Sequence, residues 1–397
     1  MKKQYLITPG PTPIPAEVAS KEALPILHHR TNEFGAIFTE VIEGLKYVFQ
    51  TKNDVLLMTC SGTGAMESAV ANLLSPGDTA IVASSGAFGE RWGKILTTYN
   101  IKAVMVRAED GHAVEPEKIQ QALHDNPTAK AVYCQHTETS TGVVTDIQAL
   151  GAIVAATPAV LVVDSISGLG GQDLQTDNWK VDVTVAGSQK GLMTAPGLAM
   201  VSVSPKAWKL IEAATSPCFY FDYEKMRESI PEKETPYTPA VTLIVSLAES
   251  LRLIKQEGLS NVFARHTWLA EATRAGVQAL GLEIFAKDPC NVLTSVVVPA
   301  GVDGKKLIKR LREDYGVSIA GGQVHLLGKI FRLAHMGYME RFDVIVALSA
   351  VEMMLHEMGA KIELGKGVAA AQKVFLTKPS AASAAKAGVS AQPAGVH

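Results

Sequence analysis

Short apolar segments alternate with helical patterns along residues 54–203, and this alternation restricts the fold more than any other feature of the chain. Each segment is a run of four to six mainly aliphatic and small residues, as expected of a buried strand. The seven segments are 54–59, 79–84, 103–106, 131–135, 160–164, 181–186 and 198–203. Strands of this kind that are joined through helices run parallel and are covered on both faces. We therefore predict an α/β domain with a mostly parallel sheet between helices.

A second, smaller α/β unit is predicted after a long helical pattern at 241–257. Its expected helices and strands lie near 259–280, 293–298, 303–314, 330–334 and 340–358. A chain of 397 residues is long enough for two such domains.

The chain divides into four predicted parts. These are an N-terminal arm at 1–20, a large domain at 21–257, a small C-terminal domain at 258–365 and an Ala-rich tail at 366–397. We expect the tail to be disordered because it is low in apolar periodicity and rich in small residues and Pro. Pro and Gly recur through residues 8–15, which predicts an extended arm lying across a surface or a partner.

The composition is that of a globular protein and argues against several classes of partner. The net charge is -2, so there is no basic surface for nucleic acid or for an anionic membrane. The sequence contains no unbroken run of about 20 apolar residues, so we expect no membrane span. The N-terminus does not resemble a signal peptide. The four cysteines show no metal-ligand spacing and fit a reducing cytosol. We therefore expect a cytoplasmic protein with no metal site.

A lysine stands among apolar residues just after one of the predicted strands. Lys190 follows Ser188 and Gln189 and precedes the apolar run 191–193. Burial there would disfavour the ammonium form and leave a neutral, nucleophilic amine. Such an amine is what a lysine needs to form a Schiff base with a carbonyl compound.

Two further polar features follow strands, at the edge of the sheet where ligands of open α/β folds bind. The glycine-rich turn at 60–66 opens a helix, whose free backbone N–H groups suit a phosphate. It lacks the third glycine of a dinucleotide loop and the Gly-Lys pair of a P-loop, and a plain tight turn fits the same residues. Asp164 ends the run 160–164, and a carboxylate at a buried strand end needs a partner such as a protonated ring nitrogen. A helix N-cap role with Ser165 is the alternative.

A polar loop and an aromatic residue complete this group. Residues 135–142 supply hydroxyl groups and an acid after another strand, where ordinary turn chemistry is the alternative. Phe88 follows a further strand and could stack on a ring or serve as a core aromatic.

One cofactor accounts for these features together. Pyridoxal phosphate needs a lysine, an anion cradle, a carboxylate facing its pyridine nitrogen and a stacking partner for its ring. The carboxylate keeps the ring nitrogen protonated, and the released lysine can then move protons.

The chain resembles the class V, fold-type I aminotransferases of the alanine–glyoxylate and serine–glyoxylate kind. The motifs that carry the resemblance are Thr8-Pro-Gly-Pro, Ser61-Gly-Thr-Gly-Ala-Met-Glu, Gly86-Ala-Phe-Gly-Glu-Arg-Trp, His136-Thr-Glu-Thr-Ser-Thr-Gly, Val163-Asp-Ser, Gly187-Ser-Gln-Lys, Thr235-Pro-Tyr-Thr-Pro and Phe331-Arg-Leu-Ala-His-Met-Gly. They run in order through residues 5–358 and are highly specific as a set.

The resemblance implies a role for each of eleven residues. Lys190 would bond the cofactor, Asp164 would face the ring nitrogen with Ile166 packed near it, and Phe88 would stack on the ring. Phosphate ligands would be Thr63, Gly64, Ala65 and Gln189, with Thr139 beside the ring oxygen. Thr238 would reach the phosphate of a neighbouring subunit, which implies a homodimer with shared active sites. Arg332 would grip the substrate carboxylate with its guanidinium fork.

The departures from the family concern substrate preference. Some relatives carry Trp where this chain has Phe88, and some carry Tyr three positions before the bridging threonine, where this chain has Thr235. The segment His28-His29-Arg30 lies where relatives have entrance residues, and a surface loop fits it equally well.

The leading hypothesis is a pyridoxal-phosphate aminotransferase that passes the amino group of serine or alanine to a small 2-oxo acid such as glyoxylate by a ping-pong mechanism. A lyase or desulfurase of the same fold is a second enzyme hypothesis. A desulfurase needs a reactive cysteine on a mobile loop, and none of the four cysteines lies in a polar, glycine-rich loop after Arg332. A phosphonate-linked aminotransferase would need an extra anion site. Some chains resembling this family are named as a subunit of a soluble hydrogenase, but this chain has no cysteine spacing for iron–sulfur or nickel.

Overall fold

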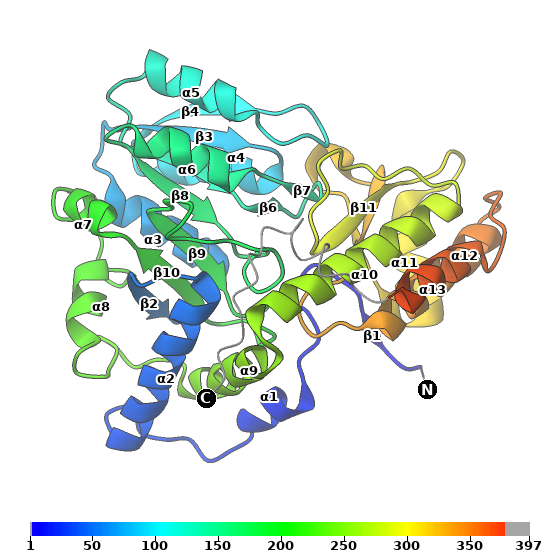
Figure 1. Cartoon of the computed structure of the whole chain (residues 1–397), viewed down its shortest axis with the longest axis horizontal. Coiled ribbons are helices and arrows are strands. Elements are labelled where there is room, and N and C mark those ends of the chain that lie inside the picture. Colours follow the sequence, from blue (N-terminus) through cyan, green and yellow to red (C-terminus); the bar gives the residue numbers. More distant parts are fainter. Residues whose placement is uncertain (1, 378–397) are drawn as a thin grey trace.

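The computed structural model describes residues 2–377, and a seven-stranded sheet forms the centre of its larger part (Figure 1). The strand order is β2-β10-β9-β8-β5-β3-β4. In chain order these strands are β2 (Asp54–Met58), β3 (Thr79–Ser84), β4 (Lys102–Arg107), β5 (Ala131–Gln135), β8 (Val160–Asp164), β9 (Val183–Gly187) and β10 (Ala199–Val203). All neighbouring strands run parallel except β10, which is antiparallel to β2 and β9. The predicted α/β fold with a mostly parallel sheet is therefore confirmed.

Helices cover both faces of this sheet because its strands are apolar on both sides. Leu56 of β2 packs into a cluster with Met66 and Trp92, on the face covered by α3 and α4. Its neighbours Val55 and Leu57 point to the opposite face, where α2 and α9 lie. The large-domain helices are α1 (Ala16–Lys21), α2 (Asn32–Phe49), α3 (Gly62–Leu73), α4 (Ala87–Thr98), α5 (Pro116–Asp125), α6 (Ile147–Ala155), α7 (Pro205–Ile211), α8 (Tyr223–Ser229) and α9 (Val241–Glu257).

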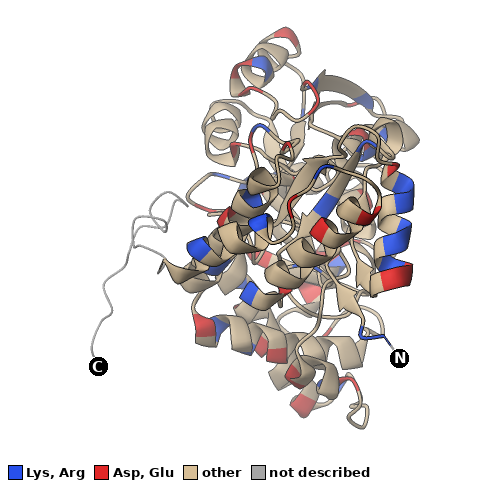
Figure 2. Cartoon of the chain, turned by 90° about the vertical axis from the view of Figure 1, so that its right-hand side faces the viewer, with Lys and Arg blue, Asp and Glu red and all other residues tan. Residues whose placement is uncertain are grey.

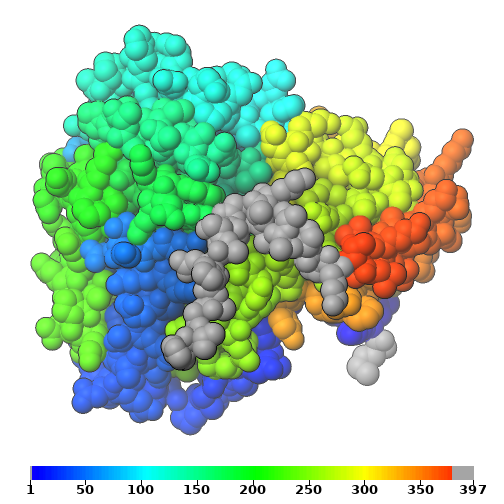
Figure 3. Space-filling model, viewed as in Figure 1, coloured from blue at the N-terminus to red at the C-terminus, as the bar shows by residue number. Residues whose placement is uncertain are grey.

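A smaller three-stranded antiparallel sheet, in the order β11-β14-β13, forms the centre of the second part. Its elements are α10 (Leu259–Ala279), β11 (Leu293–Val297), α11 (Gly304–Tyr315), β12 (Val317–Ser318), β13 (Ala320–Gly321), a 3-10 turn (Val324–Leu326), β14 (Ile330–Ala334) and α12 (Arg341–Glu357). In the space-filling view, the residues after about 280 lie beside the large body formed by the earlier ones (Figure 3). The domain boundaries inferred from the sequence stay predictions.

The N-terminal strand joins the smaller part rather than the large sheet. β1 (Tyr5–Leu6) pairs in parallel with β12. Ile7 is 1% exposed and belongs to the hydrophobic cluster of the smaller part. The arm at 8–15 contains no helix or strand and leads from there to α1 on the large part. It therefore crosses between the two parts of the chain.

Acidic and basic residues are interspersed along the ribbon in the view of Figure 2. Among residues 2–377, no helix is both long enough and apolar enough to cross a membrane.

The prediction of a disordered tail from residue 366 is wrong for its first part. Residues 366–376 form helix α13 (Lys366–Leu376), which packs against α10 and α12. The Phe375 ring meets Trp268 of α10 edge-on with their centroids 5.0 Å apart. The disordered tail was predicted from the small residues and Pro that follow residue 377, whereas Ala371 and Phe375 bury one face of this helix at helical spacing. Residues 378–397 lie outside the described part.

Replacing Phe375 with Ala should destabilise the protein by about 3 kcal/mol, because the ring fills a largely buried site on α10. The matched control is Leu376→Ala in the next position. Leu376 is 86% exposed, so its loss should change the free energy of unfolding by less than about 0.5 kcal/mol. Urea unfolding of both variants tests this, and equal effects would show that α13 does not pack as described.

Candidate active site

A cleft of about 130 Å³ lies at the carboxyl edge of the parallel sheet and brings together most of the predicted site residues. Seven of the eleven line it: Thr63, Phe88, Thr139, Asp164, Ile166, Gln189 and Lys190. They come from the turns after β2, β3, β5, β8 and β9, which end side by side. The turn after each of these strands thus contributes one or more side chains to the cleft, as is usual at the carboxyl edge of a parallel sheet.

Lys190 lies in a tight turn after β9, with its amine in the cleft. The turn is held by the backbone N–H of Met193, which donates to the Lys190 carbonyl at 3.0 Å. Burial lowers the pKa of Lys190 to about 8, while the nearby Asp164 acts in the opposite direction. The positive charges of Arg332 and Arg91 lower it further. At neutral pH a lysine of this kind is still mostly protonated, but its neutral amine fraction is far larger than that of an ordinary lysine with pKa 10.5.

The N-terminal arm packs directly on this lysine. The amine of Lys190 donates a hydrogen bond to the carbonyl of Pro9. Thr12 Oγ1 donates to the Lys190 carbonyl at 3.0 Å, and its N–H donates to that of Gln189 at 3.2 Å. Gly10 has φ +134°, and a Cβ at this position would overlap the Lys190 side chain. The φ angle favours glycine here, and an added Cβ would also displace the end of the Lys190 side chain.

Asp164 ends β8 and is 6% exposed. Its Oδ1 accepts a hydrogen bond from the N–H of Ile166 at 2.9 Å. Burial raises the pKa of Asp164 to about 7, and the negative charge of Glu138 acts in the same direction. The hydrogen bond and the positive charge of Lys190 oppose this rise. A cation placed against this carboxyl would ionise it.

The anion cradle at the start of α3 lies slightly earlier than the predicted ligands. Gly64 and Ala65 do not line the cleft, and their N–H groups donate to the carbonyl of Ser61. Within residues 2–377, the N–H groups of Gly62 and Thr63 have no such acceptor. They belong to the free donors that begin every helix. A Cβ at Gly62 would come within 2.6 Å of the Ile166 side chain, so glycine keeps the cradle open.

Thr137 is a cleft residue that the sequence reasoning missed. It is 5% exposed, lines the cleft and has an Oγ1 atom without a hydrogen-bond partner in the described part of the chain. Gln189 Oε1 also lacks a partner. Thr137 and Thr139 flank Glu138 in and after the short strand β6 (Thr137–Glu138), which pairs with β7 (Val143–Val144). Strand alternation could have identified Thr137, because residues two apart share a face.

The remaining predicted residues lie outside the cleft lining. Arg332 on β14 is 4% exposed, and its guanidinium group donates to two backbone carbonyls. Nη1 donates to the carbonyl of Thr139 at 2.5 Å. Nε and Nη2 both donate to the carbonyl of Gly321, at 2.9 and 2.6 Å. It therefore adjoins the cleft through Thr139. Thr238 is exposed and lies beside Tyr220 in a different small hollow, away from Lys190.

Glu138 fixes the start of α4 against the polar loop. It is fully buried, and Oε2 accepts from the N–H groups of Phe88 and Gly89, each at 3.0 Å. Its other oxygen accepts from the N–H and the hydroxyl of Ser140, at 3.0 and 2.6 Å. Burial raises the pKa of Glu138, and these four donors oppose the rise. The carboxylate thus holds Phe88 and Thr139 on one rigid support.

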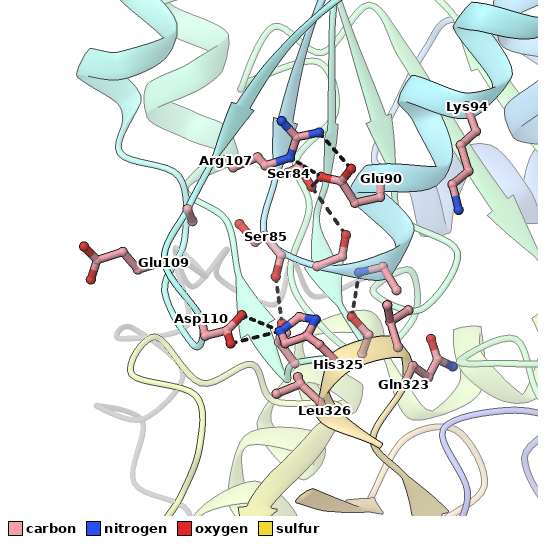
Figure 4. Close-up of a pocket in the computed structure, with 16 residues that line it drawn as sticks. Ser84, Ser85, Glu90, Lys94, Arg107, Glu109, Asp110, Gln323, His325 and Leu326 are labelled. Carbon is pink, nitrogen blue, oxygen red and sulfur yellow. Dashed lines mark hydrogen bonds and ion pairs between the residues drawn. The ribbon is translucent and has the colours of Figure 1, made fainter. Parts of the chain in front are cut away.

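A second cavity, of about 390 Å³, is a different space. It lies between the start of α4 and the 3-10 turn of the smaller part, where His325 meets Asp110 (Figure 4). It shares no lining residue with the Lys190 cleft. The smaller cleft is the better candidate for chemistry because it holds the buried lysine, the buried carboxyl group and the unpartnered polar atoms.

These residues fit pyridoxal phosphate. The unpartnered Thr137 and Gln189 oxygens, the free N–H groups of α3 and the open space at Gly62 supply polar contacts that the chain alone leaves unused. Asp164 and Lys190 supply the carboxylate and the amine.

Comparison with known proteins agrees with a site for pyridoxal phosphate. Residues 5–354 match the family model for class V aminotransferases. A protein named as the small subunit of a soluble hydrogenase, from Synechococcus sp., is 40% identical over 94% of this chain and 99% of its own length. A serine–glyoxylate aminotransferase from Methylorubrum extorquens is 37% identical over 96% of this chain and 98% of its own.

A solved aminotransferase structure has the same fold as this chain. The ureidoglycine–glyoxylate aminotransferase from Bacillus subtilis superposes with a TM-score of 0.91 at 30% identity, covering 95% of this chain and 99% of its own. The chain therefore belongs to the class V aminotransferase family, with the fold-type I architecture and pyridoxal phosphate as its cofactor.

Proposed function

We propose that this protein transfers the amino group of a small L-amino acid, serine or alanine, to a small 2-oxo acid such as glyoxylate. The observation that carries the proposal is the meeting of a buried lysine amine and a buried carboxyl group in one polar cleft. The likeness to a serine–glyoxylate aminotransferase supports this choice of substrates. The transfer would proceed in two half-reactions, donor first and acceptor second.

Pyridoxal phosphate, when bound, supplies an electron sink that allows the Cα–H bond of an amino acid to break. Lys190 Nζ accepts that proton in its neutral form and returns it when the 2-oxo acid receives the amino group. The lowered pKa of Lys190 favours this role near neutral pH. Asp164 holds a negative charge at the base of the cleft and thereby stabilises a protonated ring nitrogen.

Arg332 is suited to hold the carboxylate that both substrates share. Three of its five N–H groups are directed to backbone carbonyls, so two remain for a ligand. The carbonyls of Thr139 and Gly321 also fix the plane of the guanidinium group. A planar, fixed fork suits two-point binding of a carboxylate.

The thiols support a transaminase over a desulfurase. Burial raises the pKa of Cys60 to about 12 and raises that of Cys218 and Cys290 as well. A nucleophilic cysteine needs a lowered pKa in an exposed, electropositive place.

We also propose that the protein acts as a homodimer. Thr238 is exposed and does not line its own cleft, as expected of a residue that serves a partner's site. The nearby Phe219 and Tyr220 are 73% and 43% exposed and stack with Tyr237, which leaves an aromatic surface beside Thr238. Sedimentation at several concentrations tests this assembly. A cytoplasmic location stays a prediction.

The second candidate is a subunit of a hydrogenase-type complex, and it rests on the name of the Synechococcus relative.

An absorption experiment separates the aminotransferase from the hydrogenase-type subunit. Serine or alanine should convert the visible band of the bound cofactor to that of the amino form, and glyoxylate should restore it. L-aspartate serves as the comparison donor. Failure to bind cofactor would favour the subunit, and a band that forms without converting would indicate a lyase.

The amine of Lys190 should react with a small acylating reagent with half-maximal rate near pH 8 in the cofactor-free protein, because burial lowers its pKa to about that value. The reactive neutral fraction rises as the pH rises through 8. Mass spectrometry of the Lys190 peptide measures the rate, with exposed lysines such as Lys94 as internal references.

Asp164→Asn should move this profile to lower pH, since the carboxylate raises the pKa of the lysine. In the wild-type protein, a midpoint of the acylation profile near 10.5, the ordinary pKa of lysine, would contradict the buried placement of the amine.

A further inference from the structure

We propose that Arg91 supplies the positive charge at the phosphate end of the cofactor and orients the Thr63 hydroxyl toward the phosphate. The inference rests on the cofactor site used in the proposed function, but not on which amino acid is the donor. Arg91 was not among the residues predicted from the sequence, although it belongs to the motif that contains Phe88.

The position of Arg91 follows from helix geometry. Phe88 and Arg91 are three residues apart on α4, so their side chains share one face. The guanidinium carbon of Arg91 lies 4.7 Å from the centre of the Phe88 ring, a cation–π contact. Both residues line the Lys190 cleft. Arg91 therefore lies beside the ring that is predicted to stack on the cofactor.

Arg91 also reaches the start of α3. Its Nη1 donates a hydrogen bond to Thr63 Oγ1 at 3.0 Å. Because the hydroxyl oxygen accepts this bond, its own proton is left to donate to another group. The free N–H groups of Gly62 and Thr63 begin the same helix turn. Hydroxyl and backbone donors thus converge where the helix dipole favours an anion.

Arg91 forms no salt bridge with a carboxylate within residues 2–377, and Asp164 acts on it only at longer range. Its interactions there are the contact with Phe88 and the hydrogen bond to Thr63. Its charge lowers the pKa values of both Asp164 and Lys190, so it acts on the same cleft. Arg91 is half-buried, lines the cleft and is not held by a salt bridge, so its guanidinium group is available to bind an anionic ligand there.

The other two cations of the site have different tasks. Lys190 would hold the carbonyl end of the cofactor, and Arg332 is held by the backbone carbonyls of Thr139 and Gly321. A phosphate carries a charge of about -1.5 to -2 at neutral pH. Thr137, 5% exposed with an unpartnered Oγ1 in the cleft, is an independent sign that a polar ligand belongs there.

The support of Arg91 is rigid. Glu138 accepts hydrogen bonds from the first N–H groups of α4, at Phe88 and Gly89. The helix that carries Arg91 is thereby tied to the polar loop of Thr139. A fixed guanidinium binds an anion with little loss of side-chain entropy.

The test compares the affinities of the cofactor-free protein for pyridoxal phosphate and for pyridoxal, which lacks the phosphate. Arg91→Gln should weaken pyridoxal phosphate binding about 10- to 100-fold, since a charge-assisted interaction is lost. Its affinity for pyridoxal should stay within about twofold, because no phosphate is involved. Inorganic phosphate should compete with the cofactor less well in the variant than in the wild type.

The matched control is Lys94→Gln, which removes one positive charge from the same helix. Lys94 lies three residues further along α4, at the edge of the larger cavity (Figure 4). It is exposed and does not line the Lys190 cleft. Both affinities should stay within about twofold of the wild type.

A double substitution tests the link to Thr63. Once Arg91 is replaced, Thr63→Val should weaken pyridoxal phosphate binding less than it does in the wild type, because the two residues act as a pair. Arg91→Lys, which keeps the charge but loses the planar fork, should bind pyridoxal phosphate with an intermediate affinity.

Equal losses for pyridoxal phosphate and pyridoxal in Arg91→Gln would overturn the proposal, because Arg91 would then act through the Phe88 ring or the fold. No loss for either would overturn it as well. If Arg91→Gln does not fold, as judged by its circular dichroism, the intermediate affinity of Arg91→Lys decides the matter in the same comparison. Failure of every amino donor to convert the cofactor would refute the proposed function and leave these affinities unaffected.

Discussion

Burial of one lysine amine beside one carboxyl group is the interaction on which the rest of the structure depends. Taking Lys190 out of water lowers its pKa to about 8, and taking Asp164 out of water raises its pKa to about 7. Each group partly offsets the cost of the other, since opposite charges favour the ionised forms. In this fold the pair lies where strands end, with apolar layers below and polar turns above.

Both parts of the chain contribute residues around this pair. The strand β1 belongs to the smaller part, yet the arm that follows it brings Pro9 and Thr12 onto the turn of Lys190. From the other direction, Arg332 on β14 binds the carbonyl of Thr139 in the large part. The lysine is therefore enclosed by segments that are more than 130 residues away from it in sequence. A change in the relative position of the two parts would alter the cleft directly.

Local pattern was enough to predict much of the fold and part of the site. Apolar runs, their helical connections and the polar residues that end them identified the sheet, and the same strand ends carry Asp164 and Lys190. Thr137 was missed because the alternation within β6 was not considered. Helix α13 was missed because its residues were grouped with the Ala-, Ser- and Pro-rich tail, and its packing on Trp268 is a tertiary contact.

The sequence by itself determined the strand–helix order, the residue types at the strand ends and the glycines that keep the turns open, because these depend on neighbours in the chain. Only the tertiary structure decided that Glu138 supports α4, that Pro9 meets Lys190 and that Arg91 reaches Thr63. Those contacts join elements that are distant in sequence. Their existence depends on how the layers pack, and no local spacing of residues contains that information.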